Sequence, residues 1–393
     1  MRNPLSKVIT EIEPSGIRKF FDIVSEMKDA ISLGVGEPDF DTPWRIREEG
    51  IYTLEQGKTF YTSNAGLKDL KIEISKYLER KIHVEYDPDH EIMVTVGGSE
   101  GIDVALRAML DQGDEVLIPQ PSYVSYVPCT ILADGNPVVI PLQQKNEFKL
   151  TAEELEAAIT PKTKILVLPF PNNPTGAVME RSDLEELVDV IVANDLYVIT
   201  DEIYSELTYT EEGHVSIAAM PGMRDRTIYI NGLSKSHAMT GWRIGYACGP
   251  QVILKQMLKI HQFAIMCAPT TSQYAGVSAL KNGDEDVAHM RDEYNGRRRY
   301  LVHRFKEMGL ECFEPFGAFY AFPCIKEFGM TSDEFATRFL QEEKVAVVPG
   351  TAFGACGEGF LRISYAYSLE ALKEALDRME RFVQKLRAEK KEA

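Results

Sequence analysis

The sequence predicts an α/β protein with a mostly parallel, seven-stranded sheet, helices on both faces of the sheet, and a smaller α+β domain. Between residues 91 and 250, short apolar runs rich in β-branched residues alternate with stretches of helical length. This alternation is typical of parallel strands joined by crossover helices. At 393 residues the chain is long enough for two domains. We expect a large domain over residues 45–285 and a small domain formed by residues 1–44 and 286–393.

Composition and charge argue against several classes of function. The formal net charge of −17 disfavours binding to nucleic acid and to anionic membranes, because like charges repel. The six cysteines are widely spaced and form no CxxC pair, so we expect reduced core thiols and no metal site. No apolar run reaches the length of a membrane helix or of a signal peptide, and we therefore expect a cytoplasmic protein.

The N-terminal residues predict short elements around a turn. Residues 17–24 are amphipathic and predict a helix, and residues 44–85 predict helices that are interrupted at residues 60–66. Residues 31–43 contain two glycines and two prolines, which argue against a regular element. Gly36 lies in this turn, where the missing side chain lets the backbone approach a ligand closely. An ordinary turn is the alternative.

Seven apolar runs predict the strands of the sheet. The run at residues 164–169 is apolar almost throughout, as in a parallel strand that is buried on both faces. Gly97 and Gly98 follow the first run and precede a predicted helix at residues 100–110. A glycine turn at a helix N-terminus binds anions, although two glycines before a helix are a weak signal alone. The runs are residues 92–96, 115–119, 137–142, 164–169, 196–200, 227–231 and 243–248.

Residues of several chemical types directly follow these predicted strands. Ligands of open parallel sheets bind beyond the carboxyl ends of the strands, so one site is expected to collect these residues. Among them, an aspartate at the end of a buried strand is costly unless a cation pairs with it. The residues in this position are Gly98, Tyr123, Asn173, Asp201 and Lys235.

Lys235 has an unusual setting among small and hydroxyl residues, between the runs at 227–231 and 243–248. Desolvation lowers the pKa of a lysine held between core strands and favours the nucleophilic amine. Such an amine condenses with an aldehyde. Arg243 follows eight residues later and is placed to bind an anionic group beside the lysine. The alternative is a surface lysine and an arginine in a salt bridge.

The C-terminal residues predict the smaller α+β domain. Residues 284–308 predict a long connecting helix and residues 332–343 a second one, with strands at 317–322 and 345–348. Arg362 lies within an apolar strand, where an unpaired guanidinium is expensive. Its fork of donors suits the bidentate capture of a carboxylate.

Two motifs carry a resemblance to a known family. Ser234-Lys235 is followed by Gly-Trp-Arg-Ile-Gly at residues 241–245, and Asn-Pro-Thr-Gly occupies residues 173–176. With Asp201 and Tyr204, these motifs resemble the pyridoxal-phosphate-dependent class I/II aminotransferases, which are fold-type-I enzymes similar to aspartate aminotransferase. The match covers nearly the whole chain in the order of the family. The chain looks most like the bacterial and archaeal aromatic, aspartate and N-acetyl-diaminopimelate aminotransferases.

The resemblance implies a role for each cofactor-binding residue. Lys235 holds pyridoxal phosphate and later moves a proton, Asp201 keeps the ring nitrogen protonated, and Tyr204 donates to the phenolate oxygen. Tyr61 reaches the phosphate in the neighbouring subunit, which implies a homodimer with shared active sites. Some relatives have a serine where this chain has Gly232, so Ser234 or Ser236 is expected to compensate. The full implied set is Gly98, Ser99, Tyr123, Asn173, Asp201, Tyr204, Ser234, Lys235, Arg243 and Tyr61.

The resemblance also implies a substrate pocket. Arg362 and Asn173 bind the substrate carboxylate, and Gly36 and Ile17 line the pocket. In aspartate-specific relatives a lysine often follows the paired glycines, where this chain has Ser99. Together with the apolar Ile17, this difference indicates a broad or aromatic preference. We also predict a cis peptide bond between Asn173 and Pro174.

The function implied is transfer of an amino group from an L-amino acid to a 2-oxo acid, for which we expect 2-oxoglutarate. The donor is expected to be aromatic, aspartate or N-acyl-diaminopimelate. One alternative is a pyridoxal-phosphate C–S β-lyase, which uses the same lysine and arginines. The other is a non-enzymatic regulator with an aminotransferase-like module. The acidic composition and the early start of the family match argue against that regulator.

Overall fold

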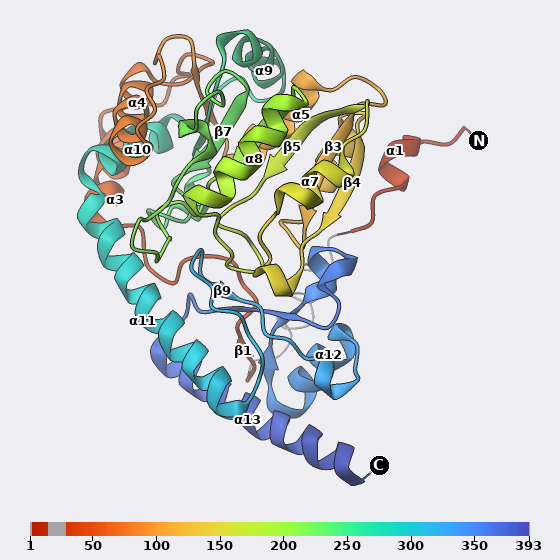
Figure 1. The fold of residues 1–393 in the computed structure, drawn as a ribbon. Helices are drawn as coiled ribbons and strands as arrows, with labels where there is room; N and C mark the ends of the chain where they lie inside the picture. The colour runs from red at the N-terminus through yellow and green to blue at the C-terminus, as the bar shows by residue number, and fades with distance from the viewer. Residues whose placement is uncertain (1, 15–28, 393) are drawn as a thin grey trace.

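The computed structural model describes residues 2–14 and 29–392. Within these ranges seven strands form one sheet in the order β2-β8-β7-β6-β5-β3-β4 (Figure 1). Strand β8 runs antiparallel to β2 and β7, and the neighbouring pairs from β7 to β4 are parallel. The predicted mostly parallel sheet is therefore confirmed. The strands are β2 (Ile92–Thr95), β3 (Glu115–Gln120), β4 (Asn136–Pro141), β5 (Thr163–Leu168), β6 (Tyr197–Asp201), β7 (Thr227–Gly232) and β8 (Gly245–Cys248).

Helices cover both faces of this sheet, as the sequence predicts. Alternate residues of β5 enter different cores: Ile165 packs in the core that includes α5 and α9, and Leu166 packs in the core that includes α8. This alternation follows from the period of two along a strand and explains the continuous apolar run. The helices are α3 (Trp44–Glu55), α4 (Lys68–Ile82), α5 (Gly98–Met109), α6 (Tyr126–Leu132), α7 (Ala152–Ala158), α8 (Arg181–Ala193), α9 (Gln251–Ala264) and α10 (Thr270–Asn282).

The remaining elements form a second part of the fold, with two small sheets, next to the large sheet (Figure 1). Strand β1 (Ile31–Ser32) pairs with β10 (Val345–Ala346), and β12 (Leu361–Ser364) lies between β11 (Val348–Pro349) and β9 (Tyr320–Ala321). The apolar run at residues 345–348 thus contributes to two small sheets, rather than to the one strand that the sequence predicts. The helices of this part are α11 (Asp284–Met308), α12 (Ser332–Glu343) and α13 (Leu369–Glu392), and a short helix α1 (Lys7–Thr10) lies near the N-terminus.

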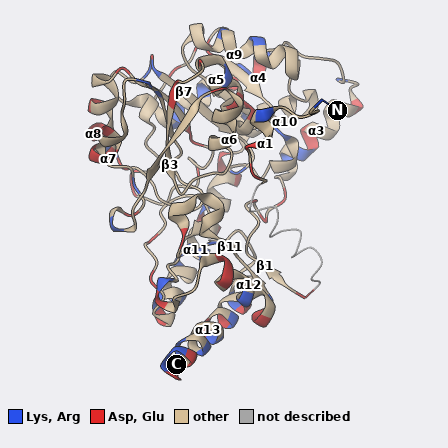
Figure 2. Ribbon diagram, turned by 90° about the vertical axis from the view of Figure 1, so that its right-hand side faces the viewer, with Lys and Arg blue, Asp and Glu red and all other residues tan. Residues whose placement is uncertain are grey.

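Charged residues of both signs are interspersed along the helices (Figure 2). On α13, Arg378 bonds to Glu374 one turn earlier, and Lys385 bonds to Glu342 of α12. None of the described helices combines enough length with enough apolar residues to cross a lipid bilayer. The predicted helix at residues 17–24 lies outside the described residues.

Candidate active site

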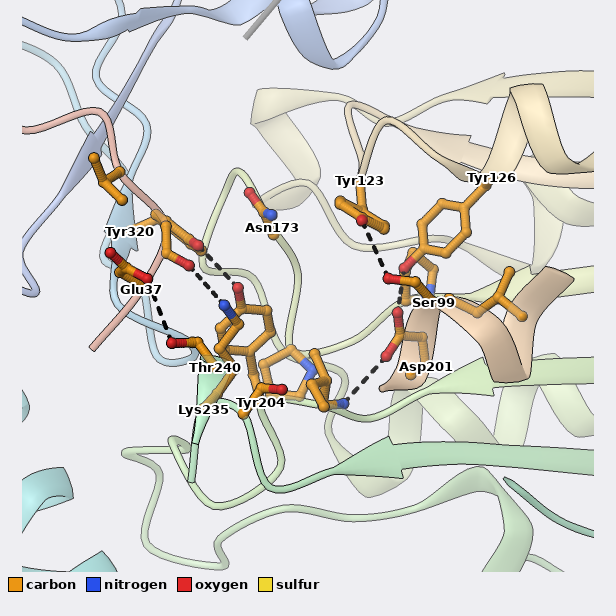
Figure 3. Close-up of a pocket in the computed structure, with 18 of the residues that line it drawn as sticks. Glu37, Ser99, Tyr123, Tyr126, Asn173, Asp201, Tyr204, Lys235, Thr240 and Tyr320 are labelled. Atoms are coloured by element: carbon orange, nitrogen blue, oxygen red, sulfur yellow. Dashed lines mark hydrogen bonds between the residues drawn. The ribbon is translucent and has the colours of Figure 1, made fainter. Parts of the chain in front are cut away.

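A cavity of about 370 Å³ lies where the strands of the large sheet end and the small sheets begin. Strands β5, β6 and β7 each end beside it, in accordance with the position of ligand sites in open parallel sheets. The side chains that line the cavity come from both parts of the molecule (Figure 3). Among the residues that the sequence singles out, the lining includes Gly36, Gly98, Ser99, Tyr123, Asn173, Asp201, Tyr204, Ser234, Lys235, Arg243 and Arg362.

Lys235 follows β7 and points into the cavity. Its Nζ donates a hydrogen bond of 2.6 Å to the main-chain carbonyl of Gly36, and its charge lies 6.0 Å from the ring of Tyr204. Burial lowers the pKa of Lys235 to about 8, and the positive charges of Arg362 and Arg243 act in the same direction. About a tenth of the amine is therefore neutral at pH 7, far more than for an exposed lysine, and the neutral amine is the form that attacks a carbonyl carbon.

Asp201 ends β6 and is the buried carboxyl of the cavity, with 8% of its surface exposed. It accepts a hydrogen bond of 2.7 Å from the Tyr126 hydroxyl and one of 3.2 Å from the Ile203 N–H. Burial raises the pKa of Asp201 to about 6, although both hydrogen bonds oppose the rise. A cation brought next to this carboxylate offsets the cost of its burial, and the protonated nitrogen of a pyridine ring is such a cation.

The N-terminus of α5 offers groups that are able to bind an anion. Gly97 precedes the helix with a positive φ of 78°, which a glycine adopts without strain, and the first turn presents free N–H groups. The guanidinium of Arg243 lies against this turn, because a Cβ on Gly97 would be 2.6 Å from Arg243 Nη2. Among the described residues no carboxylate lies within ion-pair distance of Arg243, whose Nη1 donates only to the Thr240 carbonyl. A phosphate group fits this combination of a helix terminus and an unpaired arginine.

The packing around Gly232 explains why this position has no side chain, although some relatives have a serine there. It pairs with Gly245 across β7 and β8, and a Cβ on Gly232 would lie 2.9 Å from the Ile244 carbonyl oxygen. A serine there would require the two strands to move apart. Of the two serines expected to compensate, Ser234 lines the cavity, whereas the Ser236 hydroxyl bonds to the neighbouring His237 ring at 2.8 Å. Ser234 is therefore the hydroxyl available to a ligand.

Arg362 is a second cationic group of the cavity, on the side that belongs to the small sheets. The residue lies in β12 with 2% of its surface exposed, between the rings of Tyr320 at 4.6 Å and Phe353 at 4.7 Å. Its Nη1 donates to Asn173 Oδ1 at 3.0 Å, and its Nη2 donates to the Gly34 carbonyl. These acceptors are neutral, so the guanidinium keeps its charge for a carboxylate. The peptide bond between Asn173 and Pro174 is cis, as predicted.

Among the described residues, one predicted site residue does not line the cavity. Tyr61 is 79% exposed and does not line the cavity, a position compatible with the predicted reach into a neighbouring subunit. Ile17 lies outside the described residues.

Four polar or aromatic residues that the sequence analysis did not single out also line the cavity: Glu37, Tyr126, Thr240 and Tyr320. Tyr126 follows the predicted Tyr123 by three residues and Glu37 follows Gly36 directly, so proximity in sequence was an available signal. Tyr320 lies in an apolar run without such a signal. It pairs in β9 with Ser364 of β12, close to Arg362. Only the pairing of these strands brings it to the site.

The residues of the cavity fit pyridoxal phosphate. An amine is available for the aldehyde, a buried carboxyl for the ring nitrogen, and a helix N-terminus with an unpaired arginine for the phosphate. The fold and this donor set define a pyridoxal-phosphate-dependent enzyme of the α/β class. The chain belongs to the aminotransferases of class I and II, because the model of that family matches residues 28–379.

Individual relatives agree with this assignment. The chain is 51% identical to the YugH protein of Bacillus subtilis (strain 168), named as an aminotransferase, over 98% of this chain and 100% of the relative. It is 49% identical to the aspartate aminotransferase of Pyrococcus abyssi, over 94% of this chain and 96% of that protein. The solved structure of an aromatic aminotransferase from Pyrococcus horikoshii OT3 superposes with a TM-score of 0.89 at 46% identity, over 94% and 99% of the two chains. The chain is therefore a transaminase.

Proposed function

We propose that the protein transfers the amino group of an L-amino acid to 2-oxoglutarate, with the side chains of the cavity in the roles that the family resemblance implies. The observation that carries this proposal is that Lys235, Asp201 and Arg362 line one cavity, although they come from distant parts of the chain. An amine, a buried carboxyl and a guanidinium that has only neutral acceptors among the described residues provide the proton carrier, the partner of the ring nitrogen and the carboxylate-binding group of a transamination site.

The cofactor supplies an electron sink for the charge that develops at the substrate Cα. In the proposed site Asp201 keeps a proton on the ring nitrogen, and Tyr123 packs against the ring. The N–H groups of Gly98 and Ser99, the Ser234 hydroxyl and the Arg243 guanidinium bind the phosphate. This set is supported by the position of each group on the lining of the cavity.

Lys235 is proposed to carry the proton between the substrate Cα and the cofactor carbon that receives it. A base for this step needs a pKa near the working pH, and burial brings the pKa of Lys235 to about 8. Its present acceptor, the Gly36 carbonyl, is neutral, so the hydrogen bond holds the amine at the lining of the cavity without forming an ion pair. The amine is thus free to move once the substrate occupies the site.

Arg362 is proposed to bind the α-carboxylate together with the Asn173 amide. The 3.0 Å bond between them already sets the plane of the guanidinium, and the flanking rings of Tyr320 and Phe353 hold it. A carboxylate that arrives there makes a bidentate contact and orients the Cα toward Lys235.

For the donor, we propose an aromatic amino acid ahead of aspartate or N-acyl-diaminopimelate. Ser99 occupies the position where aspartate-specific relatives often have a lysine, and it bonds to the Tyr123 hydroxyl at 3.4 Å. The described lining also offers apolar surface from Val35, Ile102 and Ile203. Such a surface favours a ring over a second carboxylate.

The discriminating experiment is a panel of donors with 2-oxoglutarate as acceptor, in which each 2-oxo acid product is quantified. Phenylalanine and tyrosine are expected to give the highest kcat/KM, followed by aspartate and N-acetyl-diaminopimelate. Formation of pyruvate and ammonia from cystathionine without any requirement for an oxo acid would instead identify a C–S β-lyase. Other 2-oxo acids in place of 2-oxoglutarate test the choice of acceptor.

We further propose a homodimer in which Tyr61 completes the active site of the partner. Phe60, Tyr61 and Phe263 are 81%, 79% and 87% exposed, which is unusual for large apolar side chains of a monomer. The Thr270 hydroxyl bonds to the Phe60 carbonyl and Asn64 bonds to the Met266 carbonyl, so the loop and the end of α9 belong to one continuous surface.

A mixed dimer tests the shared site. One subunit carries Lys235→Ala and the other Tyr61→Ala, so that sharing leaves one of the two sites with both native residues. About half of the wild-type activity is expected in the mixed dimer, and much less in either homodimer. If Tyr61 acts within its own subunit, the mixed dimer has no intact site and activity is not restored.

We also propose that the chain works as two domains, residues 45–285 and residues 1–44 with 286–393, and that it acts in the cytoplasm. The position of the cavity between the large sheet and strands β9 and β12 supports the division.

A further inference from the structure

Tyr320 joins two groups of the cavity that come from different parts of the fold. Its hydroxyl lies 2.8 Å from the hydroxyl of Tyr204, and its ring lies 4.6 Å from the guanidinium of Arg362 (Figure 3). Tyr204 follows β6 of the large sheet, whereas Tyr320 lies in β9 of a small sheet. With 1% of its surface exposed, Tyr320 has little freedom to move.

The missing side chain of Gly36 leaves the space that the Tyr320 hydroxyl occupies. A Cβ on Gly36 would overlap the Tyr320 hydroxyl oxygen, while the ring carbon Cζ would be 3.4 Å from it and Arg362 Nη1 3.7 Å from it. The hydroxyl therefore fills the space that any side chain at residue 36 would occupy. Removal of the oxygen atom alone would make room for a methyl group at ordinary contact distance.

Either hydroxyl can donate in the bond between the two tyrosines, but a bound cofactor fixes the direction of this bond. Each hydroxyl has a single proton to donate. When Tyr204 donates its proton to an ionised ring oxygen of the cofactor, it has none left for Tyr320. The contact of 2.8 Å is then kept only if Tyr320 donates to Tyr204. A donor to the Tyr204 oxygen polarises the hydroxyl and strengthens the bond that it gives.

We propose that Tyr320 is a positioning residue that donates to Tyr204 and thereby stabilises the ionised oxygen of the cofactor ring, while its ring face holds Arg362 for the substrate carboxylate. This inference rests on the proposed function of the same cavity. The relay of hydrogen bonds runs from Tyr320 through Tyr204 to the ring oxygen. It connects the small sheets to the cofactor through hydroxyl groups without a charged side chain.

The first test is Tyr320→Phe in the holoenzyme, with the pH titration of the absorbance of the bound cofactor as the readout. Loss of the donor weakens the stabilisation of the ionised oxygen, so the protonated chromophore is expected to persist to higher pH by about 0.5–1 unit. We expect kcat/KM to fall about 5–10-fold. Tyr365→Phe is the matched control, since that buried hydroxyl bonds to the Ala318 carbonyl at 3.1 Å and does not line the cavity. No shift is expected for the control.

The second test uses Gly36→Ala alone and combined with Tyr320→Phe. The alanine methyl displaces the hydroxyl in the wild-type background, so the single variant is expected to raise the titration midpoint as Tyr320→Phe does. In the Tyr320→Phe background the methyl finds space, and the added effect is expected to be less than a third of the single-variant shift. The Gly36→Ala single variant keeps Tyr320 in the chain, so its titration remains informative if Tyr320→Phe folds poorly.

The outcomes separate this inference from the proposed function. An unchanged titration midpoint in Tyr320→Phe, or shifts from the two substitutions that simply add, would overturn the role of Tyr320 in an enzyme that still transaminates. Absence of amino transfer from every donor in the panel would instead overturn the proposed function, while the spectroscopic shift still reports on the relay.

Discussion

The two walls of the cavity are built in different ways. In the sheet wall, Asp201 ends the five-residue parallel strand β6, Lys235 follows the six-residue strand β7, Gly98 starts α5, and Arg243 precedes β8. The opposite wall comprises residues 34–36, Tyr320 and Arg362 and is built from loops and strands of two to four residues. The sheet wall places charged groups where burial changes their pKa values. The opposite wall holds a cation with neutral carbonyl groups and ring faces. Chemistry at the bond to be broken is therefore expected from the first wall, and orientation of the substrate from the second.

Replacement of Lys235 by alanine is expected to have the largest effect, since it removes the proton carrier of the sheet wall. Turnover should fall by about 10³-fold or more, together with the cofactor absorbance that depends on this amine. Lys259→Ala is the control, because Lys259 is an exposed residue of α9 that bonds to Gln256. A variant at residue 235 with normal turnover would refute the division of roles between the walls.

Asp201→Asn tests whether the buried, ionised carboxylate of the sheet wall destabilises the apoprotein. Burial raises the pKa of Asp201 from 3.8 to about 6, so the folded state binds this proton more tightly than the unfolded state. The contribution to stability is complete below pH 3.8 and is lost as the pH rises through 6. The free energy of unfolding of apo wild type, relative to the variant, should fall by about 2 kcal/mol between pH 4 and 7.

Urea denaturation of both apoproteins across this pH range provides the measurement, and saturation with cofactor should abolish the difference. Parallel profiles would show that the folded carboxyl titrates normally.

Arg362→Lys tests whether the opposite wall orients the substrate without taking part in the chemical step. Lysine keeps the charge but loses the fork of donors, so KM for the amino acid should rise about 10–50-fold while kcat changes less. Arg298→Lys is a matched control: that arginine is also buried, but it bonds to Glu314 outside the cavity and should leave KM unaltered. A fall in kcat alone would assign Arg362 to the chemical step instead.

The smallest expected effect concerns the packing behind the sheet wall. Gly232→Ser pushes a Cβ against the Ile244 carbonyl and should lower the free energy of unfolding by about 1–3 kcal/mol. Gly241→Ser is the comparison, since a Cβ there has nothing within 4 Å. Thermal denaturation of the two variants decides the point. A stable Gly232→Ser variant with tighter cofactor binding would show that the strands adjust at little cost.

The two walls also differ in what the sequence reveals. Asp201 and Lys235 follow apolar runs that are long enough to be recognised as strands, and sheet topology then places them together. Tyr320 lies in an apolar run, and its partner Tyr204 is 116 residues away, so neither pattern nor spacing indicates that they meet. The division of residues 345–348 between two sheets was missed for the same reason. Short strands are defined by distant partners rather than by their own periodicity.

Lys235 and Arg362 both donate hydrogen bonds to main-chain carbonyl oxygens of the tripeptide at residues 34–36. Because these acceptors carry no formal charge, the two cations are held in place without being neutralised. The chain has a formal net charge of −17, so an approaching anion is repelled. At distances beyond the Debye length of about 8 Å, dissolved salt screens this repulsion. Inside the cavity, which salt screens less, it meets Lys235, Arg362 and Arg243, which outnumber the carboxyl groups of Glu37 and Asp201. Rising salt should therefore weaken the repulsion by the net charge of the chain more than the attraction by the positive groups in the cavity. Anionic ligands should enter most slowly at low ionic strength.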